Sequence, residues 1–245
     1  MGRAAENTDE RKGTFVSRAG KMAYYTEKLS GKRLQACYEI APPRVQQYLR
    51  AEVDHVRSRL SPEDHILELG CGYGRVMFAL AEAVSHVVGV DTAPESIRLG
   101  RRLCRPETPC EFFEMDGSAM TFRDDQFDVV FCVQNGICAF SVDKTRLVRE
   151  AIRVCRPGGR ILFSSYASRF WAPRLEWFEL QAEHGLIGEI DREATGNGVI
   201  VCKDGFRAGC MSPKEFRALW KTLGLVPTIT EVDSSSLFCE GDVRK

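Results

Sequence analysis

The residues of this chain best suited to chemistry form a glycine-rich turn, Gly70-Cys71-Gly72-Tyr73-Gly74, between an apolar run and a helical stretch. Glycine permits positive φ and lets a ligand touch the backbone, and the helix N-terminus that follows offers unpaired N–H groups to an anion. Asp91 ends the next apolar run, 21 residues after Gly70. An acid at this distance accepts hydrogen bonds from ribose hydroxyls in doubly wound folds. The pattern therefore predicts a site for an adenosine-containing ligand.

Two kinds of cofactor fit such a site. The dinucleotide fingerprint G-x-G-x-x-G needs a third glycine where this chain has Arg75. The pattern present is instead Glu68-x-Gly70-x-Gly72-x-Gly74. With this pattern the chain resembles the class I S-adenosylmethionine-dependent methyltransferases, and among them the small-molecule methyltransferases, over about residues 64–166.

The resemblance implies a cofactor and a set of contacts to it. S-adenosylmethionine would be the cofactor, and Asp116-Gly117-Ser118 matches the family's adenine-binding turn. Tyr24 and Tyr25 fall where related enzymes lay an N-terminal helix over the cofactor, and aromatic faces stabilise a sulfonium cation. Arg33 would meet the methionine carboxylate, although it fits a solvated helix equally well. The cofactor-binding residues implied in this way are Tyr24, Tyr25, Arg33, Glu68, Gly70, Cys71, Gly72, Gly74, Asp91, Thr92, Asp116, Gly117, Ser118, Val133 and Gln134.

Methyl transfer from a sulfonium is an in-line displacement that depends mainly on orientation, and it needs a base only when the nucleophile starts protonated. The segment Cys132–Cys138 should border the methyl group. It lacks the Asp/Asn-Pro-Pro-Tyr signature of base-amine methylases and the Pro-Cys nucleophile of cytosine-C5 enzymes. It resembles the glycine N-methyltransferase group, where an Asn aligned with Asn135 meets a small substrate, but a turn cap explains Asn135 equally well. The catalytic candidates are Asn135, Tyr25 and His184.

The acceptor is expected to be small and polar, with a carboxylate as the favoured group. Arg169 and Arg174 follow the fifth expected strand, where an arginine side chain could bind a carboxylate through two hydrogen bonds. The candidate substrate-binding residues are Asn135, Cys138, Arg169 and Arg174. The competing interpretation places both arginines in solvent.

Apolar runs alternate with helical stretches from residue 64 onward, which predicts a parallel sheet with right-handed crossovers. The expected strands are His65–Leu69, Val87–Val90, Cys110–Met115, Phe127–Val133 and Arg160–Tyr166, with helices at Gly74–Val84, Pro94–Cys104 and Lys144–Cys155. A helix at Phe170–Gly185, a β-excursion at Gly188–Met211, a helix from Ser212 to Leu223 and strands at Val226–Val232 and Ser236–Cys239 should follow. The fold class is therefore α/β, a doubly wound, seven-stranded, mostly parallel sheet with an antiparallel edge hairpin.

The N-terminal part is expected to be a helical lid. Pro42-Pro43 splits residues 21–60 into helices around Met22–Leu34 and Val45–Leu60. Residues 1–20 are expected to be mobile without ligand, and residues 1–35 to order over the cofactor. One methyltransferase domain, 1–245, would then comprise a cap (1–60), a cofactor-binding core (61–168), a substrate-side insertion (169–211) and the final helix and edge strands (212–245).

Composition favours a small-molecule enzyme of the cytoplasm. Lys plus Arg and Asp plus Glu number 34 each, so no net field collects nucleic acid or anionic membrane. The ten cysteines form no C-x-x-C pair and no zinc spacing, so no metal is expected. The polar start and the lack of a long apolar run predict neither a signal peptide nor a membrane span. The alternatives are a tRNA or protein methyltransferase, a thiol or metalloid methyltransferase, and an NAD-dependent oxidoreductase.

Overall fold

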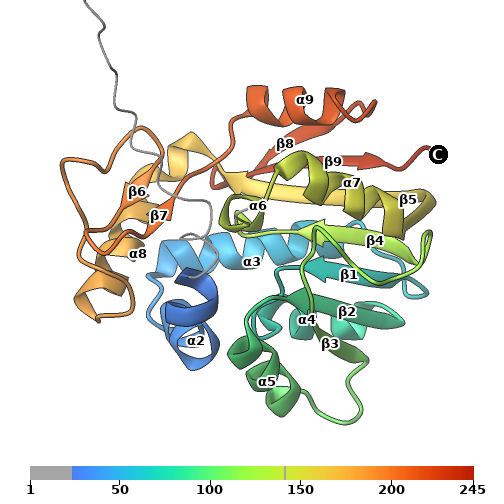
Figure 1. Cartoon of the computed structure of the whole chain (residues 1–245), viewed down its shortest axis with the longest axis horizontal. Helices are drawn as coiled ribbons and strands as arrows, with labels where there is room; N and C mark the ends of the chain where they lie inside the picture. The colour runs from blue at the N-terminus through green and yellow to red at the C-terminus, as the bar shows by residue number, and fades with distance from the viewer. Residues whose placement is uncertain (1–23, 141) are drawn as a thin grey trace, which may run out of the picture.

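The computed structural model describes residues 24–140 and 142–245, which are built around one seven-stranded sheet. Its strands stand in the order β3-β2-β1-β4-β5-β9-β8 (Figure 1). The first five pair in parallel, and β9 runs antiparallel to β5 and β8, so the doubly wound sheet with an edge hairpin is confirmed. The bounds are β1 His65–Leu69, β2 His86–Asp91, β3 Cys110–Glu114, β4 Phe127–Cys132, β5 Cys155–Tyr166, β8 Thr228–Val232 and β9 Ser236–Asp242.

The register of the sheet brings three chemically important segments to one edge. Glu68 of β1 lies between Gly89 of β2 and Phe131 of β4. Parallel strands end on the same side, so the glycine turn after β1, Asp91 at the end of β2 and the loop after β4 meet there. Open α/β sheets bind ligands at this carboxyl edge.

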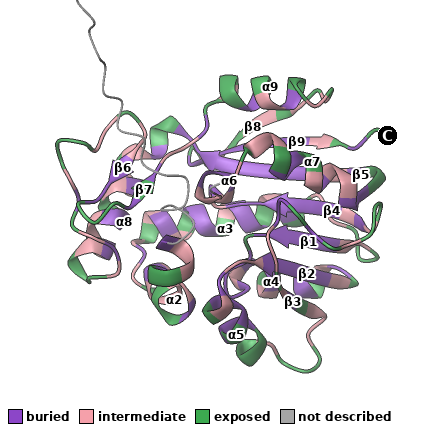
Figure 2. Cartoon of the chain, in the orientation of Figure 1, coloured by how far each residue is buried: buried purple, intermediate pink, exposed green. Residues whose placement is uncertain are grey.

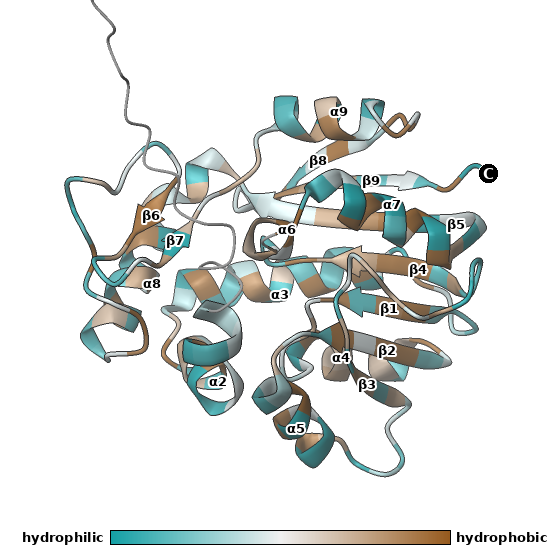
Figure 3. Cartoon of the chain, in the orientation of Figure 1, coloured by the Kyte–Doolittle hydropathy of each residue, from teal (hydrophilic) through white to brown (hydrophobic). Residues whose placement is uncertain are grey.

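Helices cover both faces of the sheet. On one face α3, α4 and α5 contribute to one buried apolar cluster, and on the other α7 and α9 contribute to a second. Figures 2 and 3 show the result: strands that are largely buried and apolar, and helices whose outer sides are exposed and hydrophilic. The bounds are α3 Pro43–Arg57, α4 Arg75–Leu80, η2 Ala81–Ala83, α5 Pro94–Leu103, α6 Gly136–Ala139, α7 Lys144–Val154 and α9 Pro213–Lys221.

A third apolar cluster lies beyond the carboxyl edge, where the N-terminal elements meet the insertion (Figure 1). The N-terminal elements are the π-helical turn η1 Tyr24–Lys28 and α2 Gly31–Glu39; the insertion holds η3 Ser168–Phe170, α8 Trp171–Glu183, β6 Ile200–Val201 and β7 Arg207–Ala208. Tyr24 packs on Phe206 with 4.8 Å between ring centroids, and the indole N–H of Trp177 donates to the Cys37 carbonyl over 2.8 Å. The N-terminal elements, residues 24–39, and the insertion, residues 168–208, are remote in sequence and together form one layer beyond the carboxyl edge of the sheet, the cover.

Two expected elements differ from the structure. The prediction of one helix over Met22–Leu34 is wrong within the described residues. The helical conformation is interrupted at Leu29–Ser30, and α2 begins at Gly31. Gly31 has φ of 55°, and its N–H donates to Ser96 Oγ over 2.9 Å, which anchors the new helix to α5. The β-excursion over 188–211 is present in short form: β6 and β7 pair over two residues each, and isolated antiparallel bridges join Ile190 to Cys202 and Gly196 to Val199. The expected ordering of residues 1–35 falls mostly on residues 1–23, outside the described part.

Within the described part of the chain, no helix has the length and apolar character needed to cross a membrane.

Candidate active site

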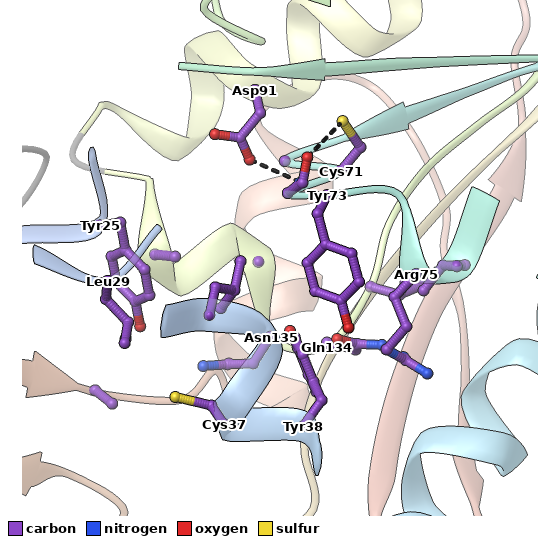
Figure 4. Close-up of a pocket in the computed structure, with 18 of the residues that line it drawn as sticks. Tyr25, Leu29, Cys37, Tyr38, Cys71, Tyr73, Arg75, Asp91, Gln134 and Asn135 are labelled. Atoms are coloured by element: carbon purple, nitrogen blue, oxygen red, sulfur yellow. Dashed lines mark hydrogen bonds between the residues drawn. The ribbon is translucent and has the colours of Figure 1, made fainter. Parts of the chain in front are cut away.

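A cavity of about 180 Å³ lies between the glycine turn and the cover. One half is lined by the carboxyl edge of the sheet and the other by side chains of the N-terminal elements and the insertion. Figure 4 shows this arrangement, with Asp91 and Arg75 on the sheet side and Tyr25, Leu29, Cys37 and Tyr38 on the cover. Of the residues expected to bind the cofactor, those that line the cavity are Tyr25, Glu68, Gly70, Cys71, Gly72, Asp91, Thr92, Val133 and Gln134.

The turn after β1 requires its glycines. Gly70, Gly72 and Gly74 have φ of 74°, 54° and 87°. A Cβ on Gly74 would lie 2.5 Å from the Phe112 ring, closer than any side chain allows. The turn is therefore both left-handed and tightly packed, and it leaves its backbone open toward the cavity.

Asp91 braces this turn from the end of β2. Its Oδ2 accepts from the Gly72 N–H over 2.9 Å and its Oδ1 from the Ala93 N–H over 2.8 Å (Figure 4 draws the first bond). Burial raises the pKa of the carboxyl, and the backbone donors lower it in part. Each carboxylate oxygen has further lone pairs, so it can accept from a ligand hydroxyl without losing the backbone bonds.

Three polar groups of the sheet side are buried without a hydrogen-bond partner in the structure. They are the Nε and Nη2 atoms of Arg75, the Nε2 atom of Gln134 and the Oε2 atom of Glu68. The Arg75 guanidinium lies 5.0 Å from the Tyr38 ring centroid, and burial raises the pKa of Glu68 well above its usual range. Unpaired buried groups are destabilising, so unpartnered donors and an acceptor along one cavity wall indicate a polar ligand of both charges.

Arg75 is a site residue that the sequence analysis missed, because it counted only as a lost glycine. Its position as the first residue of α4, directly after the glycine turn, is the signal that could have identified it. Arg33, the arginine expected there, lies elsewhere. It is exposed, and its guanidinium donates to the carbonyls of Leu186, over 2.9 Å, and Gly185, which joins α2 to the end of α8.

The loop after β4 is strained and is held from two sides. Gln134 and Asn135 have φ of 55° and 60°, which is uncommon for residues other than glycine. The Gln134 N–H donates to Glu52 Oε2 over 2.7 Å, and the Asn135 side chain donates to the Gly209 carbonyl over 2.9 Å. Asn135 Oδ1 also accepts from Ser165 over 2.7 Å. Asn135 lines the cavity, but its amide is largely committed to joining β5 and the insertion.

The cover side of the cavity is aromatic and uncharged among the described residues. Its lining comprises Tyr25, Leu29, Leu34, Cys37, Tyr38, Tyr166, Trp177, Phe178, Gln181, Phe206 and Ala208. Burial raises the pKa of Tyr25 and Tyr38, so both phenols stay protonated across the physiological range. Burial also raises the pKa of the Cys37 thiol to about 12, which disfavours the nucleophilic thiolate.

Several expected site residues lie outside the cavity lining. Arg169 has a side chain that is 75% exposed and sits 3.7 Å from Glu231. His184 is exposed at the end of α8, with Nδ1 2.9 Å from the Leu180 carbonyl oxygen. The Tyr24 hydroxyl donates to Asp204 over 2.8 Å. Cys138 is buried in the core cluster that contains α7.

Arg174 is buried, not solvated, and it lies outside the cavity lining. It is 1% exposed and donates to the carbonyls of Gly198 and Ala208 over 3.0 and 2.7 Å, and to Gly209 over 3.2 Å. The face of the Tyr166 ring lies 4.2 Å from the guanidinium carbon. These bonds hold the insertion together, and only the buried Nε atom of Arg174 has no partner. Arg174 is not among the residues that line the cavity, so the carboxylate-binding role expected of it is not supported by its position.

The Asp116-Gly117-Ser118 turn is separated from the cavity by Phe140. Cβ atoms built on Gly70 and Gly117 would each lie 3.3 Å from the Phe140 ring, so that ring fills the space between the two turns. Phe140 lines the cavity, whereas no residue of the Asp116 turn does so in the part of the chain that the structure describes. Asp116 Oδ1 accepts from the Ser118 N–H over 2.8 Å.

Two of the cysteines, Cys37 and Cys71, line the cavity. Across residues 24–140 and 142–245, no three His, Cys, Asp or Glu side chains gather as they would around a metal ion.

Comparison with known proteins finds methyltransferases similar to part of the chain. Residues 66–159 match a family model described as a methyltransferase domain. The chain is 28% identical over 137 residues to 2-methyl-6-phytyl-1,4-hydroquinone methyltransferase of Synechocystis, covering 52% of this chain and 42% of that protein. It is 32% identical over 108 residues to demethylmenaquinone methyltransferase of Clavibacter sepedonicus, covering 43% and 42%. The match thus spans less than half the length of these relatives.

The fold is shared with solved structures. Magnesium protoporphyrin IX methyltransferase of Synechocystis, with bound S-adenosylmethionine, superposes with a TM-score of 0.59 at 13% identity, covering 93% of this chain and 97% of that one. At this identity the likeness establishes the Rossmann-like fold.

Proposed function

We propose that this protein is a class I S-adenosylmethionine-dependent methyltransferase that transfers a methyl group to a small-molecule acceptor, because residues 66–159 match a methyltransferase domain. The observation that carries the proposal is the wall of unpartnered buried groups on Glu68, Arg75 and Gln134 beside the glycine turn. The two quinone-ring methyltransferases among the relatives support a small-molecule acceptor.

The unpartnered groups fit the methionine end of the cofactor. An amino acid carries one carboxylate and one ammonium group, and Arg75 with Gln134 would hold the carboxylate while Glu68 would face the ammonium. Asp91 would accept bonds from the ribose hydroxyls.

When bound, the cofactor would supply a methyl group: the acceptor lone pair would form the new bond to the methyl carbon as the methyl–sulfur bond breaks, S-adenosylhomocysteine would be the leaving group, and a protonated acceptor would give its proton to water. The chain's part is to position the acceptor and exclude water. Glu52 and Ser165 fix the Gln134–Asn135 loop at the carboxyl edge, and the cover excludes solvent with Tyr25, Trp177 and its neighbours. Tyr25 and Asn135 are thus positioning groups at this site. His184 has no part in the proposal because it lies outside the cavity lining.

Adenine would lie where the Phe140 ring now stands. The ring occupies the space between Gly70 and Gly117, so contact with Asp116 requires Phe140 to turn aside. An aromatic ring that moves this short distance can then stack on the base it admits.

None of the ten cysteines, all of which lie in the described residues, forms a disulfide, which supports the reducing cytoplasm as the proposed location. A cavity that the insertion lines on one side supports a small-molecule partner in preference to nucleic acid.

The test is ligand binding by thermal shift and calorimetry with S-adenosylhomocysteine and NAD. We expect micromolar affinity for S-adenosylhomocysteine, and at 100 times the dissociation constant about 2.7 kcal/mol of added stability. A clear shift with NAD and none with S-adenosylhomocysteine would reject the proposal.

A further inference from the structure

The aromatic side of the cavity is built from parts of the chain that are far apart in sequence. Its six rings come from η1, α2, the end of β5, α8 and the segment before β7. They are Tyr25, Tyr38, Tyr166, Trp177, Phe178 and Phe206. Tyr38 lies 6.0 Å from Trp177 and Phe178 lies 6.0 Å from Phe206 between ring centroids, so the rings form a continuous wall. Such a wall favours a flat apolar ligand through stacking and edge contacts.

This wall offers no partner to an anion. No described residue on the cover side of the cavity lining carries a charge. Arg174, the cation behind the wall, does not line the cavity: its two Nη atoms donate to carbonyls of the insertion, its unpartnered Nε is buried, and the Tyr166 ring lies 4.2 Å from its guanidinium carbon. A carboxylate placed here would lose its water without gaining a counter-ion, which is strongly unfavourable.

A second cation is also disfavoured. Aromatic rings attract cations, but three of these rings already contact an arginine. Two of them contact Arg174, whose guanidinium carbon lies 4.2 Å from the Tyr166 ring centroid and 5.5 Å from that of Phe178. Arg75 lies 5.0 Å from the Tyr38 ring on the opposite side of the site. In Figure 4 Tyr25 and Arg75 stand at opposite ends of the labelled side chains, with Asn135 between them in this view. The positive charges of the site are therefore already in place, and like charge repels a further one.

The polar groups on this side are neutral. The hydroxyls of Tyr25 and Tyr38 and the amide of Gln181 come from residues that line the cavity. Each can accept or donate a hydrogen bond without carrying a charge. They suit a ligand with one or two hydroxyl or carbonyl groups on a mainly apolar frame.

We infer that the acceptor is a neutral, flat, largely apolar ring compound, of the phenol or quinol class, stacked against the wall of Tyr25, Tyr38, Trp177 and Phe206. This inference rests on the proposed methyltransferase function, and it replaces the carboxylate acceptor expected from Arg169 and Arg174.

The test compares one ring in three charge states. Calorimetry with the S-adenosylhomocysteine complex would use 2-naphthol, 2-naphthoate and 2-naphthylmethylammonium, with decahydro-2-naphthol as the non-planar neutral control. We expect 2-naphthol to bind, both charged analogues to bind at least about tenfold more weakly, and the saturated control to lose several-fold. Binding of either ion as tightly as the naphthol, or no binding of naphthol at about 1 mM, would overturn the inference.

A pair of matched variants locates the naphthol. Phe206→Leu removes a ring from the wall, and Phe216→Leu removes a buried ring of α9 in another cluster. We expect the first to weaken naphthol binding by about three- to tenfold and the second to leave it unchanged, with S-adenosylhomocysteine affinity retained in both. Equal effects of the two variants would contradict the placement. If S-adenosylhomocysteine binds and naphthol does not, only the acceptor class is wrong; if S-adenosylhomocysteine does not bind, the proposed function itself fails.

Discussion

Glu52 and Gln134 are 82 residues apart, yet the carboxylate of one holds the backbone of the other. Glu52 is 0% exposed, and its Oε2 accepts from the Gln134 N–H over 2.7 Å while its Oε1 accepts from the Ser236 hydroxyl over 2.7 Å. The left-handed loop at the centre of the site is thus fixed from α3. The carboxyl group of Glu52, buried in the core, therefore holds the backbone of the Gln134–Asn135 loop in its left-handed conformation.

Replacing Glu52 should therefore reduce both stability and cofactor binding. Glu52→Ala leaves the Gln134 N–H and the Ser236 hydroxyl unpaired, at a cost of roughly 2–4 kcal/mol in the free energy of unfolding. Glu52→Gln keeps one acceptor and should lose less. Urea denaturation and calorimetry with S-adenosylhomocysteine measure the two effects, and a fully stable Glu52→Ala protein would show that the loop does not depend on this bond.

Arg75 should discriminate the amino-acid end of the cofactor. We expect Arg75→Met to weaken S-adenosylhomocysteine binding by roughly 10- to 100-fold, because a charge-assisted carboxylate bond is lost. 5′-Methylthioadenosine lacks that end, so its affinity should hardly change. Arg33→Met, which removes an exposed guanidinium outside the cavity lining, is the matched control and should leave both affinities as they are. Equal losses for both ligands would mean that Arg75 supports the turn only.

Asp91→Ala should weaken the binding of S-adenosylhomocysteine by roughly 10- to 150-fold, because charge-assisted hydrogen bonds to the ribose hydroxyls contribute about 1.5–3 kcal/mol. The variant also loses the bonds to the Gly72 and Ala93 N–H groups, so some stability falls with the affinity. Calorimetry on the folded variant is the measurement. Unchanged affinity would limit Asp91 to its backbone role.

The stability of the insertion should depend on Arg174 and not on Arg169. Arg174→Met removes the donor to the buried Ala208 carbonyl and to the part-buried carbonyls of Gly198 and Gly209, which should lower the free energy of unfolding by roughly 1–3 kcal/mol. Limited proteolysis should then cut first within residues 185–205. Arg169→Met removes an exposed ion pair and should change stability by less than about 0.5 kcal/mol. Equal protease resistance of the two variants would contradict this account of the insertion.

Glu68 should make the ligand-free protein less stable as pH rises. Burial raises its folded pKa well above the unfolded value, so above pH about 4.5 the unfolded chain releases the proton first. Stability contributed by the protonated form is therefore lost between the unfolded pKa and the folded one. Melting temperatures from pH 4 to 8 should fall less steeply for Glu68→Gln than for the wild type. Parallel curves would assign the pH dependence to other groups.

The sheet could be predicted from sequence because its signals are local. His65–Leu69 was expected as a strand and is β1, and the glycine turn, the following helix and Asp91 lie where periodicity placed them. The break in the first helix was not predictable in this way, because it depends on a bond from Gly31 to Ser96 in α5. Local pattern fixes an element, whereas contacts between remote elements decide where it begins.

The arginines show the same limit at the site. The partner of Arg33 is the carbonyl of Leu186, 153 residues away. Two nitrogens of Arg75 have no partner at all, and Arg174 donates to carbonyls as far as Gly209, 35 residues away. None of these relationships can be inferred from neighbours along the chain. The roles proposed for the cofactor-contacting residues stay predictions until a complex is measured.

The Phe140 ring between Gly70 and Gly117 has a kinetic consequence. A base that reaches Asp116 must wait for the ring to rotate, and the same ring must rotate again before the spent nucleoside departs. Arrival and departure are then governed by one side-chain motion in the loop before α7. A smaller residue at position 140 should speed both steps, and departure more than arrival, because the stacking contact between the ring and the base is lost as well.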